Sequence, residues 1–377
     1  MTVPEPTVAH LLQEARTLHR LGHRDRAIAL LAAEAARPAL ALEMRLNLLL
    51  LLGMIEEERG NLDAAIVRYE TASALSPGHG LFFSRLGLLR MRRSWSARLP
   101  PRETPGGDPA RRVSMTELGQ MGRFCDQLSQ YILLRCYARR HDLTPEVPDW
   151  VGRHLFALDD PAPADPLPAL SPDARSVPAW LGAFAGTAPP LVGHDLTAAL
   201  CWALFGTDVY WRLLARDKTF IQGLFRPVPT VAVHADRAMA ALRQRGTTVV
   251  AVHLRRGDFR TAAPDRMTSE AAVLEMLDAL WPTLPEPVLY LASDEAAAVA
   301  PAFARFAPVL ADDLAPPLPG ADYFLDWYVL TQADVVAVSL SRFSWVAAQL
   351  NGRARAFYAP SASGALRPFN PWEDRLL

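Results

Sequence analysis

A cluster of charged residues directly follows a strongly apolar segment in the C-terminal part of the chain. Residues 247–252 are apolar and β-branched, which predicts a buried parallel strand. The strand runs into His253, Arg255, Arg256 and Asp258. Ligands bind at the carboxyl ends of strands in open α/β sheets, and adjacent guanidiniums match the oxygens of a diphosphate. The spacing also suits an Arg–Asp pair that only fixes a loop.

A second polar pair follows the next apolar run. Ser293 and Asp294 come directly after residues 288–292, which predict another buried strand. This pair therefore also stands at the carboxyl end of a predicted strand. Serine and aspartate are also common helix caps, and the alternative is that they only start the following helix.

A third segment opens a helix after the apolar run 335–338. Ser341, Phe343 and Ser344 stand at the expected start of this helix. The free N–H groups and the hydroxyls of such a start suit a phosphate. Aromatic residues of a helix that faces a sheet usually pack in the core, so Phe343 is expected either there or against a ligand.

An earlier glycine-containing loop precedes the predicted helix 128–139. It contains Gly122, Arg123, Asp126 and Gln127. A loop of this kind, leading into a helix start, is a generic site for an anion or a hydroxyl. Asp126 has two interpretations, as an N-cap of the helix or as a carboxylate that takes a proton.

Taken in order, these segments resemble the motifs of fucosyltransferases that use GDP-fucose. Residues 253–258 look like the H-x-R-R-G-D motif. Residues 122–127 look like the G-R-F-G-N-Q loop of protein O-fucosyltransferases and the G-x-G-N-Q loop of α-1,2-fucosyltransferases. Residues 289–294 are similar to a family strand that ends in S-D-D. Residues 326–346 resemble the block D-x-x-L-M-x-x-C … N-S-T-F-S-W-W.

The resemblance covers roughly residues 118–375, with the stretch 145–245 poorly matched. Several positions depart from the family patterns. Cys125 stands for a glycine, Asp126 for an asparagine and Glu295 for an aspartate. In the last block the mismatched residues are Leu340, Arg342 and Val346.

The resemblance implies an inverting GT-B glycosyltransferase that moves L-fucose from GDP-fucose to a glycan hydroxyl, with no metal and no cofactor. Arg255 is then expected to stabilise the departing diphosphate, and Asp126 to take the proton of the acceptor. No Asp-x-Asp motif is present to bind a metal–diphosphate complex, so arginines would supply the positive charge. The acceptor loop would comprise Gly122, Arg123 and Gln127. The donor-binding residues would be His253, Arg256, Asp258, Ser293, Asp294, Asp326, Ser341, Phe343 and Ser344.

Two other functions stay open. In the first, the chain is a protein O-fucosyltransferase whose N-terminal helices recruit a polypeptide acceptor. In the second, it is a degenerate transferase that acts as a binding protein, as the departures at Cys125, Leu340 and Arg342 suggest.

The first 95 residues contain an internal repeat. The pattern Gly-x-x-Asp-x-Ala-Ile occurs at residues 22–28 and again at 60–66. It predicts helices near 7–20, 24–36, 42–58, 62–75 and 80–92. The second unit resembles the second helix of a tetratricopeptide repeat, and such repeats serve either as protein-binding surfaces or as spacers.

The rest of the chain is expected to form an α/β pair of Rossmann-like domains. After the helical repeats 1–95 and a linker 96–111, residues 112–244 are predicted to form the acceptor domain and residues 245–377 the nucleotide-sugar domain. A proline-rich stretch, 161–190, is expected to be a surface loop. The strands and helices predicted beyond residue 248 cover 249–254, 269–280, 288–292, 295–306, 324–333, 335–338, 343–350 and 356–359.

Bulk composition narrows the possible partners and the compartment. The net charge of −1 argues against a nucleic-acid surface. Cys125, Cys136 and Cys201 are too few for a disulfide framework or a cysteine-based zinc site, so free thiols in a reducing cytoplasm are expected. The first residues lack the basic and apolar regions of a signal peptide, so none is expected, and no apolar run approaches the ~20 residues of a membrane span.

Overall fold

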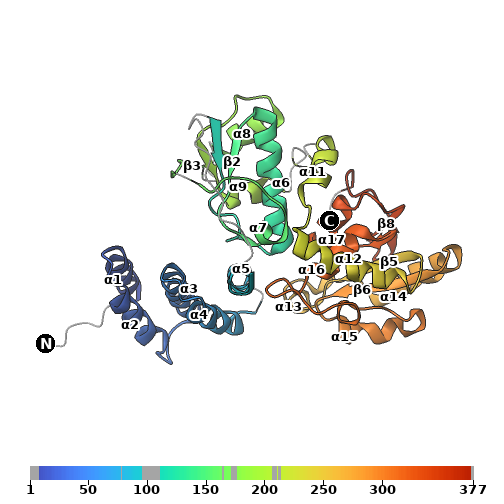
Figure 1. Ribbon diagram of the computed structural model, residues 1–377, viewed down its shortest axis with the longest axis horizontal. Helices are drawn as coiled ribbons and strands as arrows, with labels where there is room; N and C mark the ends of the chain where they lie inside the picture. The colour runs from blue at the N-terminus through green and yellow to red at the C-terminus, as the bar shows by residue number, and fades with distance from the viewer. Residues whose placement is uncertain are drawn as a thin grey trace. The chain divides into compact units, whose positions relative to one another are not determined.

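The computed structural model describes residues 8–77, 79–95, 111–163, 165–170, 176–205, 210 and 214–374. The chain divides into two compact units, Met1–Arg98 and Leu99–Leu377. In Figure 1 the first unit is blue, and the second runs from green to red. Most of the predicted linker 96–111 lies outside the described residues. Among the described residues, no helix combines the length and the hydrophobicity that crossing a membrane requires.

The first unit is a series of helices in which each packs against the next. They are α1 (Val8–Arg20), α2 (Arg24–Ala35), α3 (Leu42–Glu58), α4 (Leu62–Leu75) and α5 (Gly80–Trp95), close to the predicted ranges. Gly22 and Gly60 have φ angles of +83° and +75°, so glycine ends the preceding helix in each repeat. The ring of Tyr69 lies against Gly53, where a side chain would overlap it. The assignment to tetratricopeptide repeats stays a prediction.

The N-terminal half of the second unit is α/β, with very short parallel strands. The strand order is β2-β1-β4-β3, where β1 is Arg112–Ser114, β2 is Thr144–Glu146, β3 is Ala169–Leu170 and β4 is His194–Leu196. Its helices are α6 (Phe124–His141), α7 (Val151–Leu155), α8 (Ser176–Ala185) and α9 (Ala198–Leu204). Leu128, Tyr131 and Leu134 of α6 are fully buried. The predicted loop 161–190 is wrong, because β3 and α8 lie within it.

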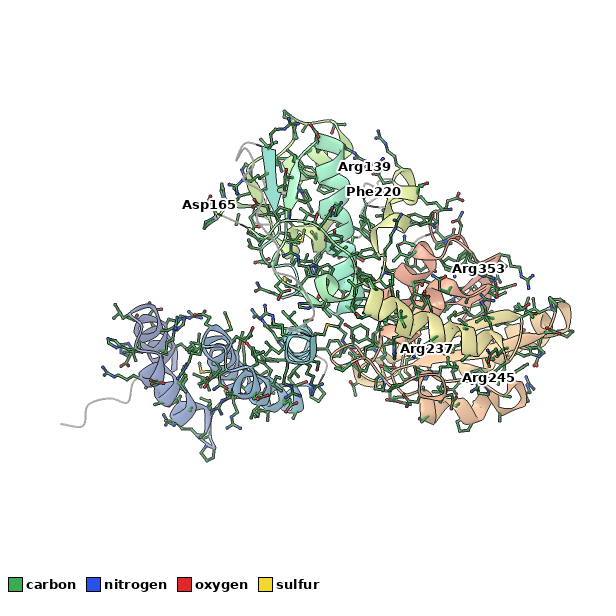
Figure 2. The ribbon with its side chains drawn as sticks, viewed as in Figure 1. Arg139, Asp165, Phe220, Arg237, Arg245 and Arg353 are labelled. Atoms are coloured by element: carbon green, nitrogen blue, oxygen red, sulfur yellow. The ribbon has the colours of Figure 1, made fainter. Side chains whose placement is uncertain are left out.

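The helix α11 (Lys218–Leu224) leads from this half of the second unit to the next. It packs against both α6 and α17 (Arg342–Leu350). The Arg139 guanidinium of α6 lies 4.6 Å from the ring centre of Phe220 in α11, and Figure 2 labels both side chains. Such a cation–π contact adds to the packing of α6 against α11.

The C-terminal half contains a five-stranded sheet in the order β6-β5-β7-β8-β9. Strands β5 (Thr248–Leu254), β6 (Pro287–Ser293), β7 (Val335–Ala337) and β8 (Ala356–Pro360) are parallel. Strand β9 (Leu366–Pro368) was not predicted and runs antiparallel to β8. Every residue of β5 is buried, as expected for a strand covered on both faces.

Helices cover both faces of this sheet. Val250, Val252 and Leu254 share one core with α14 (Glu270–Leu280) and the 3₁₀ helix Ala300–Phe306. On β5 the alternate residues, His253 among them, point to the opposite face. The helices α12 (Pro229–Arg243) and α16 (Phe324–Gln332) pack against β5.

One predicted helix differs from the structure. The sequence predicts a helix over residues 295–306, but α15 covers only Ala296–Val299, and a 3₁₀ helix follows. Pro301 lies at the start of that 3₁₀ helix. Proline has no N–H to donate and clashes with the preceding turn, which explains why the α-helix stops.

The strand order places β5 at a switch point of the sheet. From β5 the chain crosses to β6 on one side and later to β7 on the other. In open α/β sheets, ligands bind outside the carboxyl ends of the strands at such a switch point. His253 to Asp258 emerge at this point.

Candidate functional site

Arg255 is held by two carboxylates at the end of β5. Its Nη1 lies 2.6 Å from Oδ2 of Asp294, which follows β6. Its Nη2 donates a hydrogen bond to Oδ1 of Asp258. The side chain is 15% exposed, and the guanidinium lies 5.7 Å from the ring centre of Phe259. The structure therefore brings together Arg255, Asp258 and Asp294 from the two predicted clusters.

The loop wraps tightly around the Asp294 carboxylate. The backbone N–H of Arg256 donates to Oδ1 of Asp294 at 2.8 Å. Gly257 has φ of +31°, and a β-carbon there would overlap Oδ2 of Asp294. Only glycine combines this backbone angle with this close approach. The Asp294 carboxylate therefore contacts both the backbone of the loop and the side chain of Arg255. The N-cap of α15 is Glu295, so the alternative that Asp294 caps this helix is wrong.

Arg256 is buried, and its guanidinium bonds two groups near the loop. Its Nη1 donates to the backbone oxygen of Arg255 at 3.0 Å, and its Nη2 donates to Oε1 of Glu270 at 2.9 Å. These contacts connect the loop to the first turn of α14. They shape the loop, and a donor-binding role of Arg256 stays a prediction.

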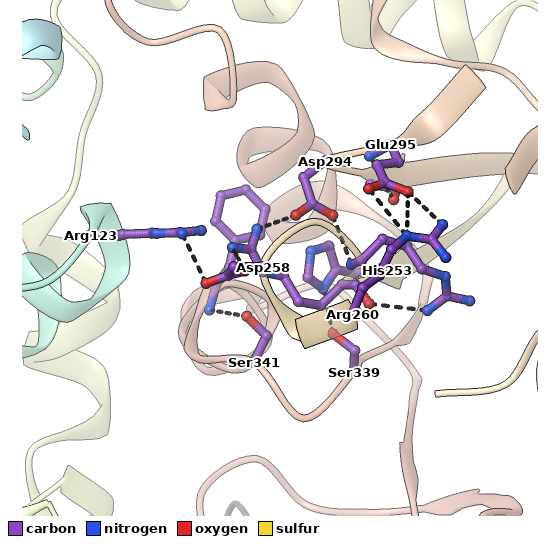
Figure 3. A network of polar contacts seen from close by, with 12 residues as sticks. Arg123, His253, Asp258, Arg260, Asp294, Glu295, Ser339 and Ser341 are labelled. Atoms are coloured by element: carbon purple, nitrogen blue, oxygen red, sulfur yellow. Dashed lines mark hydrogen bonds and ion pairs between the residues drawn. The ribbon is translucent and has the colours of Figure 1, made fainter. Parts of the chain in front are cut away.

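His253 is a buried, neutral connector between β5 and α17. Its Nδ1 lies 2.7 Å from Oγ of Ser339 and 3.0 Å from Oγ of Ser344. Burial, assisted by the charge of Arg256, lowers the pKa of His253 to about 3. The imidazole is therefore uncharged at physiological pH. Figure 3 shows the ring beneath the loop, with Ser339 next to it.

The serine hydroxyls at the start of α17 form hydrogen bonds within the protein. Ser341 is the N-cap, and its Oγ accepts the N–H of Phe343 at 3.4 Å. Oγ of Ser344 accepts the N–H of Ser339 at 3.3 Å. The ring of Phe343 packs 5.1 Å from the ring centre of His253. Contacts of these residues with a phosphate stay a prediction.

Asp326 lies in the first turn of α16 and contacts β6. Oδ1 accepts a hydrogen bond of 2.6 Å from the hydroxyl of Tyr290. Burial raises the pKa of Asp326 to about 7, although the bonds from Tyr290 and the backbone of Ser293 lower it. Oγ of Ser293 accepts the N–H of Glu295 at 3.1 Å, but the N-cap of α15 is Glu295 and has no side-chain cap bond, so the capping alternative is wrong for Ser293.

The predicted acceptor loop is a tight turn into α6. Gly122 has φ of +74°, and a β-carbon there would overlap the Asp126 side chain. Nε2 of Gln127 donates to the backbone oxygen of Gly122 at 3.3 Å. The N-cap of α6 is Arg123, so the interpretation of Asp126 as N-cap is wrong. Asp126 lies in the first turn, and its Oδ2 accepts the N–H of Arg123 at 2.8 Å.

Two ion pairs join the acceptor loop to the C-terminal half. Nη2 of Arg123 donates to Oδ2 of Asp258 at 2.9 Å, and Figure 3 shows Arg123 reaching this carboxylate. Nη1 of Arg342 donates to Oδ1 of Asp126 at 2.8 Å. The two pairs run in opposite directions, since each half contributes one arginine and one aspartate. The carboxylate of Asp258 thus contacts both Arg123 and Arg255.

Sequence reasoning missed Arg342 as a member of this site. In the sequence Arg342 is only a mismatch to a family motif, whereas Asp126 is both a mismatch and the expected proton acceptor. The structure pairs these two mismatches with each other. Their opposite charges were the available signal, but sequence spacing gave no reason to connect residues that are 216 positions apart.

Burial raises the pKa values of two groups at the start of α6, Asp126 and Cys125. It raises the pKa of Asp126, while the charge of Arg342 and its hydrogen bond lower it. Burial also raises the pKa of the Cys125 thiol, which donates to the backbone oxygen of Phe343 at 3.6 Å. Cys125 is therefore a protonated packing residue. Within the described residues, no three His, Cys, Asp or Glu side chains are grouped to hold a metal ion.

No family model matches the chain, and neither does any curated protein. Some solved structures resemble it loosely. The fucosyltransferase NodZ from Bradyrhizobium is 15% identical with a TM-score of 0.45, over 69% of this chain and 97% of NodZ. A NodZ α-1,6-fucosyltransferase crystallised with GDP is 16% identical with a TM-score of 0.44, over the same shares. A variant of FUT1 from Arabidopsis thaliana in complex with GDP is 13% identical, with a TM-score of 0.45, over 84% of this chain and 80% of FUT1.

Proposed function

We propose that the chain is an inverting, metal-independent glycosyltransferase that moves L-fucose from GDP-fucose to a hydroxyl of a glycan. The observation that carries the proposal is the position of Arg255. It lies at the switch point of a parallel sheet and is fixed by carboxylates from two strand ends. The motif resemblance of residues 253–258 supports GDP-fucose as the donor.

The chemistry of transfer requires a preorganised cation at this point. The acceptor oxygen attacks the anomeric carbon, the bond from that carbon to the diphosphate breaks, and GDP leaves with the bonding electrons. Negative charge builds on the diphosphate in an oxocarbenium-like transition state. A guanidinium that is already oriented stabilises this charge without reorganisation. Arg255 fits the role because Asp258 and Asp294 fix its orientation.

Asp126 is the proposed general base. It belongs to the N-terminal half, whereas the proposed donor-binding loop, residues 255–258, belongs to the C-terminal half. Arg123 connects the two, because its backbone N–H bonds Asp126 and its guanidinium bonds Asp258. Burial raises its pKa, which makes the carboxylate a stronger base than an exposed one. In the proposed reaction the proton of the acceptor hydroxyl passes to Asp126 as the new glycosidic bond forms.

A second candidate is a nucleotide-sugar-binding protein without catalysis. One observation favours it, because both oxygens of Asp126 already accept hydrogen bonds, from Arg123 and Arg342. The helical repeats of the first unit would then present the bound complex to a partner. Protein O-fucosylation, with a polypeptide recruited by the same repeats, differs from the main proposal only in its acceptor.

A nucleotide-sugar panel tests the donor. GDP and GDP-fucose should raise the melting temperature more than UDP or UDP-sugars, with or without EDTA. At a hundredfold excess over Kd, binding stabilises the native state by about 2.7 kcal/mol. Arg255→Ala is the matched variant and should lose most of the shift. A preference for UDP-sugars, or a strict metal requirement, would contradict the donor assignment.

A transfer assay separates the two candidates. GDP release from GDP-fucose in the presence of a glycan mixture, followed by mass spectrometry of the products, should detect a fucosylated glycan. Binding of GDP-fucose without transfer to a glycan or a protein would support the binding protein instead. Fucose found on serine or threonine of a protein would identify the acceptor class as polypeptide.

A further inference from the structure

Arg342 is placed to act on Asp126 across the two halves of the second unit. It is the first residue of α17, while Asp126 lies in the first turn of α6. Nη1 of Arg342 is 2.8 Å from Oδ1 of Asp126, and the two side chains are 26% and 20% exposed. An ion pair that is mostly buried is screened by water much less than a surface pair.

Two aromatic rings fix the Arg342 guanidinium. Its central carbon lies 4.4 Å from the ring centre of Trp202 and 4.2 Å from that of Phe205. Both rings come from α9 and its C-terminal cap. Cation–π contacts at this distance favour the charged guanidinium and restrict its rotation. The two rings and the Asp126 carboxylate therefore hold the guanidinium in place together.

Arg342 is the cation whose guanidinium bonds the Asp126 carboxylate in the described structure. Arg123 contributes its backbone N–H to Oδ2 of Asp126, and its own guanidinium extends to Asp258. Among the described residues, Cys125 and Tyr210 are titratable groups that interact electrostatically with Asp126. Burial raises the pKa of both, so both are neutral at physiological pH.

The carboxylate of Asp126 keeps the capacity to accept a proton. An ionised carboxylate has about four acceptor positions on its two oxygens. The described hydrogen bonds use one on Oδ1, from Arg342, and one on Oδ2, from Arg123. The bonds that hold Asp126 therefore leave acceptor positions for a substrate hydroxyl.

We propose that Arg342 is a positioning residue, which holds the Asp126 carboxylate ionised and oriented to take the proton of the acceptor. The proposal rests on the proposed transferase function. Arg342 exchanges no proton itself, since the proton of the acceptor passes to Asp126 and the guanidinium stays charged. The competing view is that the pair only links the two halves of the unit, and this view predicts a pH-independent loss on mutation.

The pH profile of kcat/KM distinguishes the two views. In Arg342→Gln, loss of the positive charge should raise the pKa of Asp126 and move the acid limb of the profile to higher pH. The loss of kcat/KM should then be about an order of magnitude larger at pH 6 than at pH 9. Arg342→Lys keeps the charge and should hold the limb close to that of the wild type. An equal loss at both pH values in Arg342→Gln would overturn the proposal.

A matched control is Arg353→Gln. Arg353 also pairs with a carboxylate in this half, through a 2.8 Å contact from its Nε to Oδ1 of Asp334, and Figure 2 labels it on the surface. Its profile should coincide with that of the wild type. In an Asp126→Asn background, Arg342→Gln should no longer change the shape of the profile, because the group it acts on is gone.

A second measurement does not depend on activity. The Asp126 carboxyl can be titrated by carbon-13 NMR in the full chain, with the signal assigned through its absence in Asp126→Asn. Arg342→Gln should shift this titration to higher pH, and Arg353→Gln should not. An unshifted titration overturns the inference. Absence of transfer by the wild type, together with a shifted titration, would refute the proposed function and keep the electrostatic part of the inference.

Discussion

Arg255 and Asp294 form a 2.6 Å ion pair between the ends of two adjacent parallel strands. The register of the sheet explains why they meet, since Leu254 lies opposite Ser293 and each charged residue directly follows its strand. The cation proposed for the diphosphate is thus oriented before a ligand binds. A guanidinium carries five N–H donors in one plane, so it can bond the two carboxylates and still offer donors to phosphate oxygens.

Replacement of Arg255 by lysine should be nearly as damaging as replacement by alanine. Lysine keeps the charge but loses the fork that grips Asp294, Asp258 and a diphosphate together. We expect a loss of two or more orders of magnitude in kcat/KM, about 3 kcal/mol of transition-state stabilisation. Steady-state kinetics with GDP-fucose measures the loss.

Arg260→Lys is the control for this substitution. Arg260 also follows β5 and pairs with a carboxylate, with its Nε 2.9 Å from Oε2 of Glu295, but it is exposed. Its replacement should change kcat/KM little, because an exposed pair contributes little and Arg260 is not assigned to the diphosphate. Near-normal kinetics of Arg255→Lys would show that Arg255 does not bind the diphosphate.

Gly257→Ala should disrupt the proposed donor-binding loop, residues 255–258, without removing a charged group. The new β-carbon would overlap the Asp294 carboxylate, and the backbone angle would be strained. We expect a loss of ~1–3 kcal/mol in the free energy of unfolding, together with weaker GDP binding by calorimetry. Gly352→Ala is the control, because a β-carbon there meets no atom within 4 Å. Equal GDP affinity in both variants would show that the loop does not contact the nucleotide.

Asp126→Asn separates catalysis from the structural role of this carboxylate. The asparagine oxygen can still accept the N–H of Arg123, so the start of α6 should persist. A general base contributes typically about 10²–10⁴-fold to the rate. The variant should therefore fold, bind GDP and lose most of its turnover. An unchanged kcat between about pH 6 and pH 9 would leave Asp126 with a structural role alone.

Asp326→Asn should alter the pH dependence of stability. Because burial raises the pKa of Asp326 to about 7, the native state favours the protonated carboxyl. Its contribution to stability is full below the ordinary aspartate pKa of ~3.9 and is lost as the pH rises through about 7. Between these values the contribution falls by ~1.4 kcal/mol per pH unit.

Urea unfolding at several pH values measures this effect. The asparagine variant should lose the corresponding slope and keep an acceptor for the Tyr290 hydroxyl. Asp278→Asn, at an exposed position of α14, should leave the slope as in the wild type. Identical slopes in wild type and Asp326→Asn would mean that folding does not raise the pKa of Asp326.

The strands of the C-terminal half could be predicted because hydrophobicity, β-branched residues and the polar residues at the strand ends all indicate the same limits. The runs at β5 and β6 are apolar, β-branched and bounded by polar residues, and both strands occur within a residue of the predicted limits. The N-terminal half gave weaker signals. Its strands have only two or three residues, which is too short for periodicity, and α8 lies within a proline-rich segment.

The sequence predicted which segments form the candidate site, but it did not predict the contacts between the two halves. Arg255, Asp258 and Asp294 share one strand edge, and position along the strands predicts that they meet. The bonds of Arg123 to Asp258 and of Arg342 to Asp126 depend on how two α/β halves pack. No local pattern determines that packing. The buried, neutral state of His253 likewise follows from the position of α17, which sequence spacing does not give.

Both edges of the five-stranded sheet are protected against pairing with strands of other chains. An open strand edge offers unpaired N–H and C=O groups to other chains and promotes aggregation. On one side, β9 is short and ends at Pro368, which has no N–H to donate. On the other side, Val309 bonds to the backbone of Leu289 and Leu291 and covers the edge of β6. Loss of the segment around Val309 would therefore expose β6 to intermolecular strand pairing.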